Sequence, residues 1–199
     1  ERGGLGILAL MPVVPGASEA RVCRVPVDGS APPSPLFDWK DWYQSVAQTS
    51  RGEFIVAGRD SFVRIPAGGG APSAPVKVVV DGIRVDNIVF HGLVLPGDAH
   101  AVVQITYYDA SGFHIGLGAV DLRTGHVTML VADGGHPALA PTGELVFSRG
   151  DTIFAVPFDA AKLAARGTPV AVWRGVGAMS EHHPGVFELT DSGALVYPP

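Results

Sequence analysis

The chain has 199 residues, of which 47% are hydrophobic and only 17% charged, with a formal net charge of −5. This acidic balance excludes the basic footprint that nucleic acid or an anionic membrane surface would require. No stretch reaches the ~18 consecutive apolar residues of a membrane span, so we expect no membrane insertion by this segment. The 26 glycines and 17 prolines are typical of many short strands joined by turns.

The first predicted elements are strands over residues 5–10, 21–27 and 35–37. We interpret the apolar run from Gly3 to Val14 as strand rather than signal peptide, because it lacks a charged leader and a small-residue cleavage site. Cys23 is the only cysteine, which excludes an intrachain disulfide. Its place in an alternating run favours a buried strand cysteine over a reactive thiol.

Further strands are expected in groups of four along the rest of the chain. In the segment 152–158, alternation of Ile153 and Ala155 with Phe154 and Val156 predicts a strand packed on both faces. In the doublet Tyr107-Tyr108, alternation predicts one buried and one exposed ring. The expected strands are 43–48, 53–58, 61–66 and 76–80; 88–95, 101–107, 116–122 and 127–131; 137–140, 144–148, 152–158 and 169–173; and finally 186–189 and 194–197.

A glycine-tipped turn followed by a short apolar run recurs five times, at a spacing of about 45–50 residues. One four-stranded sheet with its turns needs about 40–50 residues, so this period predicts the blades of a β-propeller. We therefore expect an all-β fold of four-stranded antiparallel blades. The turn glycines are Gly4, Gly52, Gly97, Gly143 and Gly193.

The strand count predicts an open arc of about four blades. A closed four-bladed ring needs sixteen strands and the expected set has seventeen, which favours an arc cut from a larger ring, such as one of six blades. An arc leaves apolar faces and strand edges uncovered. We therefore expect a protein or peptide partner, or a second copy of the chain completing the ring. The predicted divisions are a partial blade over 1–42, blades over 43–87, 88–135 and 136–180, and a partial blade over 181–199.

Three segments, 118–127, 141–148 and 153–159, resemble the TolB-like, WD40-like propeller repeats of bacterial proteins, in particular those attached to membrane serine/threonine kinases. The segment 189–197 has the same repeat pattern. The usual Ser-Pro-Asp-Gly turn of those repeats is altered here to Ala-Pro-Thr-Gly at 140–143 and Thr-Asp-Ser-Gly at 190–193. The resemblance implies an extracytoplasmic location and a binding role, although some such propellers are lyases or lactonases with metal and histidine, and others gate serine peptidases.

The histidines form the one cluster of candidate site residues. His91 and His136 lie six and seven residues before their turn glycines, which predicts matching places where an inner strand begins, near the channel mouth. His182 and His183 precede the last inner strand, and Gln44 or Ser45 takes the matching place in the second repeat. Such a ring could hold a divalent metal or an acidic ligand; alternatively, polar residues simply begin these strands. His100, His114 and His126 are expected on the surface.

The densest aromatic patch, at a crossing between blades, contains Trp39, Trp42 and Tyr43. Two interpretations of this patch stay open: packing between blades, and a platform that binds a peptide. No nucleophile elbow, P-loop or His-Glu-x-x-His motif occurs. We therefore assign no catalytic residue, metal ligand or cofactor.

The sequence favours a non-catalytic ligand- or protein-binding module, a sensor or scaffold part of a larger bacterial envelope or receptor-kinase protein. The alternatives are a lyase or hydrolase with a histidine and metal site formed by His91, His136 and His183, and the gating propeller of a serine peptidase. The binding role is favoured because no set of carboxylates and histidines has a convincing catalytic spacing.

Overall fold

The computed structural model describes residues 6–12, 20–26, 28–39, 45–177, 185–190 and 192–198. Within these ranges the chain forms strands and turns and no helix, which confirms the all-β class. Accordingly, no described segment is a helix with the length and hydropathy needed to cross a membrane.

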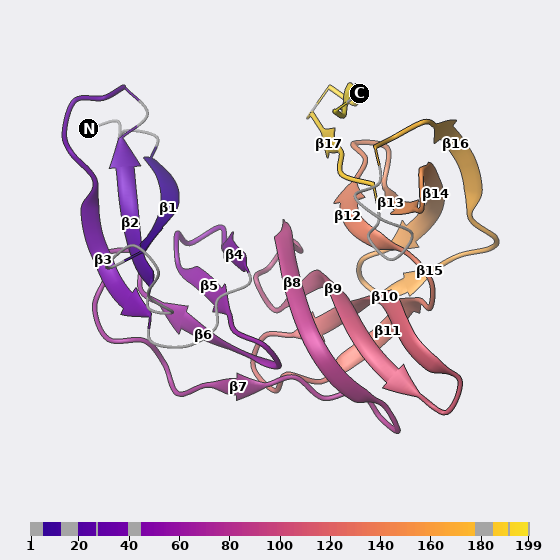
Figure 1. Ribbon diagram of the computed structural model, residues 1–199, viewed down its shortest axis with the longest axis horizontal. Coiled ribbons are helices and arrows are strands. Elements are labelled where there is room, and N and C mark those ends of the chain that lie inside the picture. The colour runs from indigo at the N-terminus through magenta and orange to yellow at the C-terminus, as the bar shows by residue number, and fades with distance from the viewer. Residues whose placement is uncertain are drawn as a thin grey trace.

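The strands form four antiparallel sheets that follow one another along the chain, and a short C-terminal pair (Figure 1). The first sheet contains β1 (Gly6–Pro12), β2 (Ala20–Pro26) and β3 (Ser34–Trp39). The second contains β4 (Ser45–Gln48), β5 (Phe54–Ala57), β6 (Ser61–Ile65) and β7 (Val76–Lys77). The third contains β8 (Arg84–Val94), β9 (His100–Asp109), β10 (Gly112–Asp121) and β11 (Val127–Val131).

The fourth sheet is followed by the C-terminal pair. It contains β12 (Gly135–Leu139), β13 (Glu144–Arg149), β14 (Thr152–Asp159), β15 (Ala164–Ala165) and β16 (Val170–Arg174), and the C-terminal pair is β17 (Glu188–Leu189) and β18 (Leu195–Val196). Both β15 and β16 pair with β14, at its two ends.

These strands overlap the predicted strands, but β8 and β10 of the third sheet begin early and the short strand β15 was not predicted; β10 begins at Gly112 rather than at residue 116. β8 begins at Arg84 rather than at residue 88, so the predicted division between residues 87 and 88 falls inside a strand. The cause is a tight Asp81-Gly82 turn, in which Gly82 has a φ of 70° and the Ile83 amide donates to the Val80 carbonyl. Asp-Gly is a strong hairpin signal, and it starts β8 early.

The turn glycines have the predicted role. Gly52, Gly97, Gly143 and Gly193 all adopt a positive φ, between 81° and 97°, where a side chain would be strained. Gly4 lies outside the described residues. In the second, third and fourth sheets and in the C-terminal pair, the repeat in the sequence therefore reflects a repeated backbone conformation at the turn between the first two strands.

Each interface between neighbouring sheets buries an apolar cluster. Val22 of the first sheet packs with Phe54 of the second, and Phe62 of the second packs with Ile105 of the third. Leu117 of the third sheet packs with Phe147 of the fourth. A sheet in the middle of the series is thus covered on both faces, as stacked repeats require.

Individual predictions of burial are confirmed by these clusters. β14 packs on both faces, with Val156 toward the third sheet and Ile153 toward the C-terminal pair. Tyr107 is buried whereas Tyr108 is exposed, and Cys23 is buried in β2.

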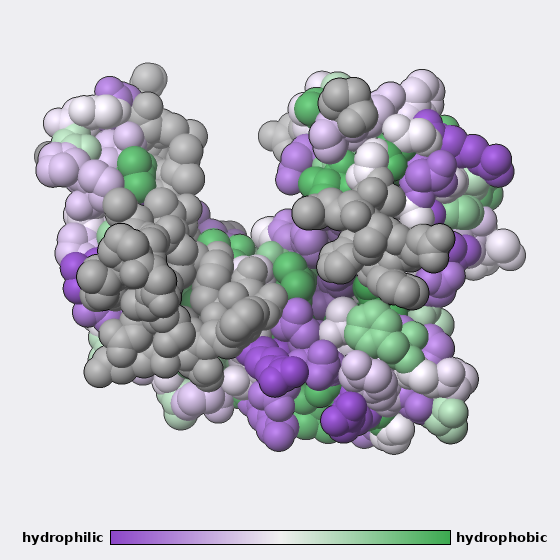
Figure 2. Space-filling view, in the orientation of Figure 1, coloured by the Kyte–Doolittle hydropathy of each residue, from purple (hydrophilic) through white to green (hydrophobic). Residues whose placement is uncertain are grey.

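The sheets lie side by side in an open arc with the first sheet and the C-terminal pair at its two ends (Figure 1). Contacts between neighbouring sheets run through the first strands β4, β8 and β12, which are therefore innermost. The space-filling view shows a notch between the ends of the arc (Figure 2). Among the described residues, β17 and β18 pair only with each other. The number of blades in a complete ring stays a prediction.

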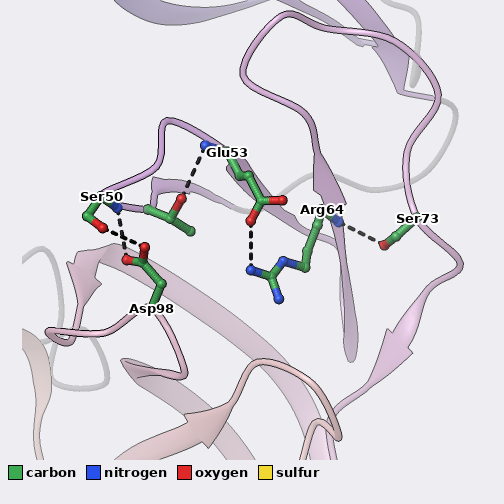
Figure 3. Close-up of polar contacts among 6 residues, drawn as sticks. Ser50, Glu53, Arg64, Ser73 and Asp98 are labelled. Atoms are coloured by element: carbon green, nitrogen blue, oxygen red, sulfur yellow. Dashed lines mark hydrogen bonds and ion pairs between the residues drawn. The ribbon is translucent and has the colours of Figure 1, made fainter.

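Polar side chains also tie the sheets together. Asp98, in the turn after β8, accepts hydrogen bonds from the Ser50 amide at 2.8 Å and the Ser50 hydroxyl at 2.6 Å (Figure 3). These bonds lower the pKa of Asp98. Within the second sheet, the half-buried Arg64 guanidinium donates to the Glu53 carboxylate at 2.7 Å, so these two charges are paired with each other (Figure 3).

Candidate functional site

The two histidines that the sequence singles out come together between the third and fourth sheets. The rings of His91 on β8 and His136 on β12 have their centroids 4.4 Å apart. The prediction that they occupy the starts of inner strands is wrong for His91, which lies near the end of β8 because that strand begins early. Both side chains are partly buried rather than open at a channel mouth.

A β-bulge in each inner strand brings the rings together. On β8 the register shifts between Phe90, opposite Val103, and Val94, opposite Ala101, so the segment with His91 bulges. On β12 a shift between Gly135 and Ala138 places His136 in a second bulge, with a φ of 51°. Bulges re-aim side chains, and a left-handed conformation is uncommon for a residue other than glycine.

His136 binds the C-terminal segment through a hydrogen bond to its backbone. Its Nε2 lies 2.6 Å from the Phe187 carbonyl oxygen, and because a carbonyl only accepts, Nε2 carries the proton. The His136 amide donates to the Gln104 side chain at 2.9 Å. Nearby, the buried Ser148 hydroxyl donates to the Gly185 carbonyl at 2.7 Å. Much of the polar capacity of His136 is therefore used in holding the C-terminal pair against the fourth sheet.

Burial keeps the histidine pair uncharged. The pKa of His91 is lowered to about 4, chiefly by desolvation and to a smaller extent by the nearby His136. A hydrogen bond with the Gln104 side chain acts in the opposite direction and raises it. Desolvation also lowers the pKa of His136, partly offset by the Phe187 carbonyl and the charge of Glu188. His91 Nε2 is buried without a hydrogen-bond partner among the described residues. A neutral pair gives no charge attraction for an acidic ligand at pH 7.

The other predicted site residues are not brought to this pair by the described part of the chain. Gln44, Trp42, Tyr43, His182 and His183 lie outside the described residues, and Trp39 is described only as the last residue of β3. Ser45, the alternative to Gln44, accepts a hydrogen bond from the Phe90 amide at 2.7 Å, across to β8. Over the described ranges, no group of three or more His, Cys, Asp or Glu side chains could hold a metal ion.

A pocket of about 180 Å³ lies beside the histidine pair, between the third and fourth sheets. We call it the interblade pocket. It reaches Gly135 and the buried Ser148, next to His136. It is lined by Phe113, His114, Ile115, Ala132, Asp133, Gly134, Gly135, Ser148, Arg149 and Gly150.

The charged groups at the pocket are already engaged. Arg149 donates to the Asp133 carbonyl oxygen, pairs with its carboxylate at 2.8 Å, and stacks over Phe154 with 4.8 Å from its Cζ to the ring centroid. His114 also lines the pocket, and at the β9–β10 hairpin its ring contacts two further polar side chains, Asp109 and Ser111.

That polar group is not a catalytic triad. The Ser111 hydroxyl and the Asp109 carboxylate both contact the same His114 nitrogen, Nε2, at 2.8 and 2.9 Å, whereas a relay needs the two partners on different nitrogens. Ser111 and, to a smaller extent, His114 lower the pKa of Asp109 to about 2. The arrangement stabilises the turn, and His114 is less exposed than expected because its ring stacks on Tyr107.

The pocket residues Phe113, Asp133 and Arg149 were missed in the sequence. The one signal for Phe113 was the Asp81-Gly82 turn, which predicts a long third sheet and thus a hairpin that reaches past its neighbours. The position of Asp133 and Arg149 follows from packing between sheets, which no local pattern indicates.

Comparison with known proteins identifies the fold. No family model matches the chain, and no curated protein sequence does. Among solved structures, the chain is similar to the Dos1 propeller, with 12% identity, a TM-score of 0.54, and coverage of 88% of this chain and 45% of that one. A protein of Agrobacterium tumefaciens provisionally named TolB matches with 10% identity, a TM-score of 0.53, and coverage of 81% and 55%.

A third similar structure is provisionally named a gluconolactonase, with 15% identity, a TM-score of 0.56, and coverage of 97% of this chain and 71% of that one. At these identities the likeness shows the fold alone. The chain therefore has the fold of a β-propeller of four-stranded blades, as its resemblance to TolB-like repeats implied. It spans about half the length of the first two structures.

Proposed function

We propose that this chain is a non-catalytic protein-binding module, which takes a side chain of a partner segment into the interblade pocket. The observation that carries the proposal is the size of the pocket. Its volume of about 180 Å³ suits one amino-acid side chain, and is below the roughly 300–1,000 Å³ of pockets that enclose small-molecule substrates.

The state of the polar groups supports binding rather than catalysis. Arg149 is paired with Asp133, His114 with Asp109, and His136 with the Phe187 carbonyl. Nucleophilic and proton-transfer chemistry need a general base that is oriented by a separate acidic group. None of these three pairs supplies such a base. The pocket edge instead has an exposed aromatic ring, Phe113, a residue type that anchors protein partners.

The chain covers 45% and 55% of the length of two similar propellers. This coverage supports a place within a larger assembly. We include in the proposal that the module is a sensor or scaffold part of an extracytoplasmic envelope or receptor protein. In such a protein the pocket would recognise a segment of a second protein.

A peptide-display selection against the full chain tests the function. Selected peptides are measured by isothermal titration with the wild type and with Ala132→Trp, which fills the pocket from an exposed position. We expect Ala132→Trp to weaken binding at least tenfold, and the control Ala161→Trp, in an exposed turn outside the pocket, to leave it unchanged.

Two results would contradict the proposal. One is equal binding by the wild type and Ala132→Trp. The other is stoichiometric metal in the purified protein, found by elemental analysis, together with hydrolysis of a lactone or ester that His136→Ala abolishes. That result would favour the enzyme alternative.

A further inference from the structure

Three side chains stand in a row across the end of the third sheet. In the strand register Tyr108 of β9 lies opposite Arg84 of β8 on one side and Phe113 of β10 on the other. The Arg84 Cζ lies 4.7 Å from the centroid of the Tyr108 ring. The rings of Tyr108 and Phe113 meet edge to face, with centroids 5.4 Å apart. We call this row the ladder.

The ladder is an exposed surface that leads into the interblade pocket. Tyr108 is 38% and Phe113 44% exposed, and Arg84 is exposed as well. Phe113 and Ile115 both line the pocket, and Leu117, on the same face of β10, packs against the fourth sheet. The strands of the third sheet are longer than those of the fourth sheet that packs on them. The ladder therefore lies on the same face as Leu117, but beyond the part of that face that the fourth sheet covers.

The three side chains are of the kind that dominate binding energies. Tyrosine and arginine are enriched among the residues that contribute most to protein interfaces, and aromatic residues lose little entropy on binding. Each member of the ladder is also held by its neighbour, through a cation–π contact or an edge-to-face contact. The surface is therefore ordered before a partner arrives.

The charge of the ladder indicates the chemistry of the partner. Among the described residues, no carboxylate forms an ion pair with Arg84, whereas the neighbouring cations are engaged, Arg59 by Asp86 and Arg149 by Asp133. A guanidinium that lies over a ring still presents N–H groups, which can bind a carboxylate in two-pronged geometry. The ladder therefore combines an apolar platform with one unneutralised positive charge.

We propose that the partner segment carries an aromatic or large aliphatic side chain followed by an acidic residue, the first entering the interblade pocket past Phe113 and the second pairing with Arg84. This inference rests on the proposed function and adds the composition of the ligand. A basic segment is disfavoured because it would place a positive charge beside Arg84.

Three synthetic peptides test the inference by nuclear magnetic resonance titration of the whole chain. They are acetyl-Gly-Trp-Glu-Glu-Gly-amide, the same peptide with two lysines in place of the glutamates, and the first peptide with alanine in place of tryptophan. We expect the first to shift the amide signals of Gly134, Gly135 and Gly150 and to bind about threefold to fivefold more tightly than the lysine peptide, as suits an exposed ion pair. The alanine peptide should cause little shift.

Variants separate the two parts of the ladder. Arg84→Gln should remove the preference for glutamate over lysine, whereas Arg59→Gln, a matched loss of an exposed arginine outside the ladder, should leave it in place. Tyr108→Ala and Phe113→Ala should weaken both tryptophan peptides. Unchanged amide spectra in the absence of peptide show that each variant is folded.

The inference is overturned if the lysine peptide binds as tightly as the glutamate peptide, or if Arg84→Gln leaves their ratio unchanged. Its failure is distinguishable from failure of the proposed function. If display-selected peptides of another composition bind and Ala132→Trp blocks them, the pocket binds protein segments but the acidic-aromatic specificity is wrong.

Discussion

The outer strands of the third and fourth sheets are both largely apolar in sequence but opposite in burial. β11 is Val-Thr-Met-Leu-Val, and Val127 and Val131 at its ends are buried. β16 is Val-Ala-Val-Trp-Arg, and all five residues are exposed, with Val170 at 64% and Trp173 at 49%. Both strands pair with the third strand of their own sheet, so pairing does not explain the difference.

The difference is made by the neighbouring sheet. Leu130 and Val131 of β11 are covered by Phe158, Leu163 and Ala165, which belong to β14 and the segment that follows it. The C-terminal pair covers only the inner part of the fourth sheet, including Val146 and Ile153. Val170 and Trp173 lie opposite Ala155 and Ile153, hence on the same face, but beyond this cover. In a stacked-sheet fold, burial depends on the next sheet as much as on the strand itself.

The largest effect is expected in the fully covered interface. Leu117→Ala, in the core between the third and fourth sheets, should lower the free energy of unfolding by about 4 kcal/mol, because Leu117 is fully buried and its removal leaves a cavity. Urea denaturation followed by circular dichroism measures the change. A loss below about 1 kcal/mol would mean that this interface is not packed as described.

Acid should loosen the same interface through His91. Its pKa is about 4 in the folded protein and near 6.5 when unfolded, so the unfolded chain takes up the proton first. The stabilising contribution is complete above pH 6.5 and is lost as the pH falls toward 4, a change of about 3 kcal/mol. His136 acts in the same direction. Urea midpoints between pH 7 and 4.5 measure this loss.

Two variants isolate that pH dependence. His91→Asn should reduce the change between pH 7 and 4.5 and leave the part due to His136, while His126→Asn, on an exposed histidine, should preserve the full change. An equally steep loss of stability in His91→Asn would show that other groups cause the acid response.

A smaller and more local effect is expected at the C-terminal pair. Phe187 is 1% exposed and packs on Val146, Ile153 and Val176. Phe187→Ala should free the C-terminal pair from the fourth sheet and cost about 2 kcal/mol, because among the described residues this pair packs against the fourth sheet alone. Hydrogen exchange should show faster exchange at Leu189 and Leu195 with the third sheet unchanged. Faster exchange throughout the molecule would contradict this local role.

The smallest effect is expected on the uncovered face. Trp173→Ala removes a ring that is half exposed and touches Tyr197 at a centroid distance of 6.1 Å. Its cost should stay below about 0.5 kcal/mol, the usual range for surface substitutions. A cost as large as that of Leu117→Ala would show that part of the chain covers β16 in solution, and the comparison of the two strands would fail.

Local patterns predicted the architecture well and the site only in part. The turn glycines and the alternating segments indicated the sheets, because positive φ and side-chain alternation are properties of the local chain. The matching positions of His91 and His136 indicated that the two belong together. Their burial and their bulges were not predictable, since a register shift depends on the partner strand.

The ladder shows the same limit. One ring of the Tyr107-Tyr108 doublet was expected to be exposed, without saying which, and the row of Tyr108 with Arg84 and Phe113 requires the register of three strands from 84 to 113. The interblade pocket depends further on how the fourth sheet packs against the third. Interactions between sheets, rather than those within a strand, define the candidate site.

Hydrogen exchange with a bound display-selected peptide tests the central claim most directly, because it compares the interblade pocket with the apolar face of β16 in one sample. The account predicts that the peptide slows exchange at residues 113–115, 133–135 and 148–150 and leaves 170–174 unchanged. Slowed exchange confined to 170–174 would place binding on the uncovered face and contradict the assignment of the pocket.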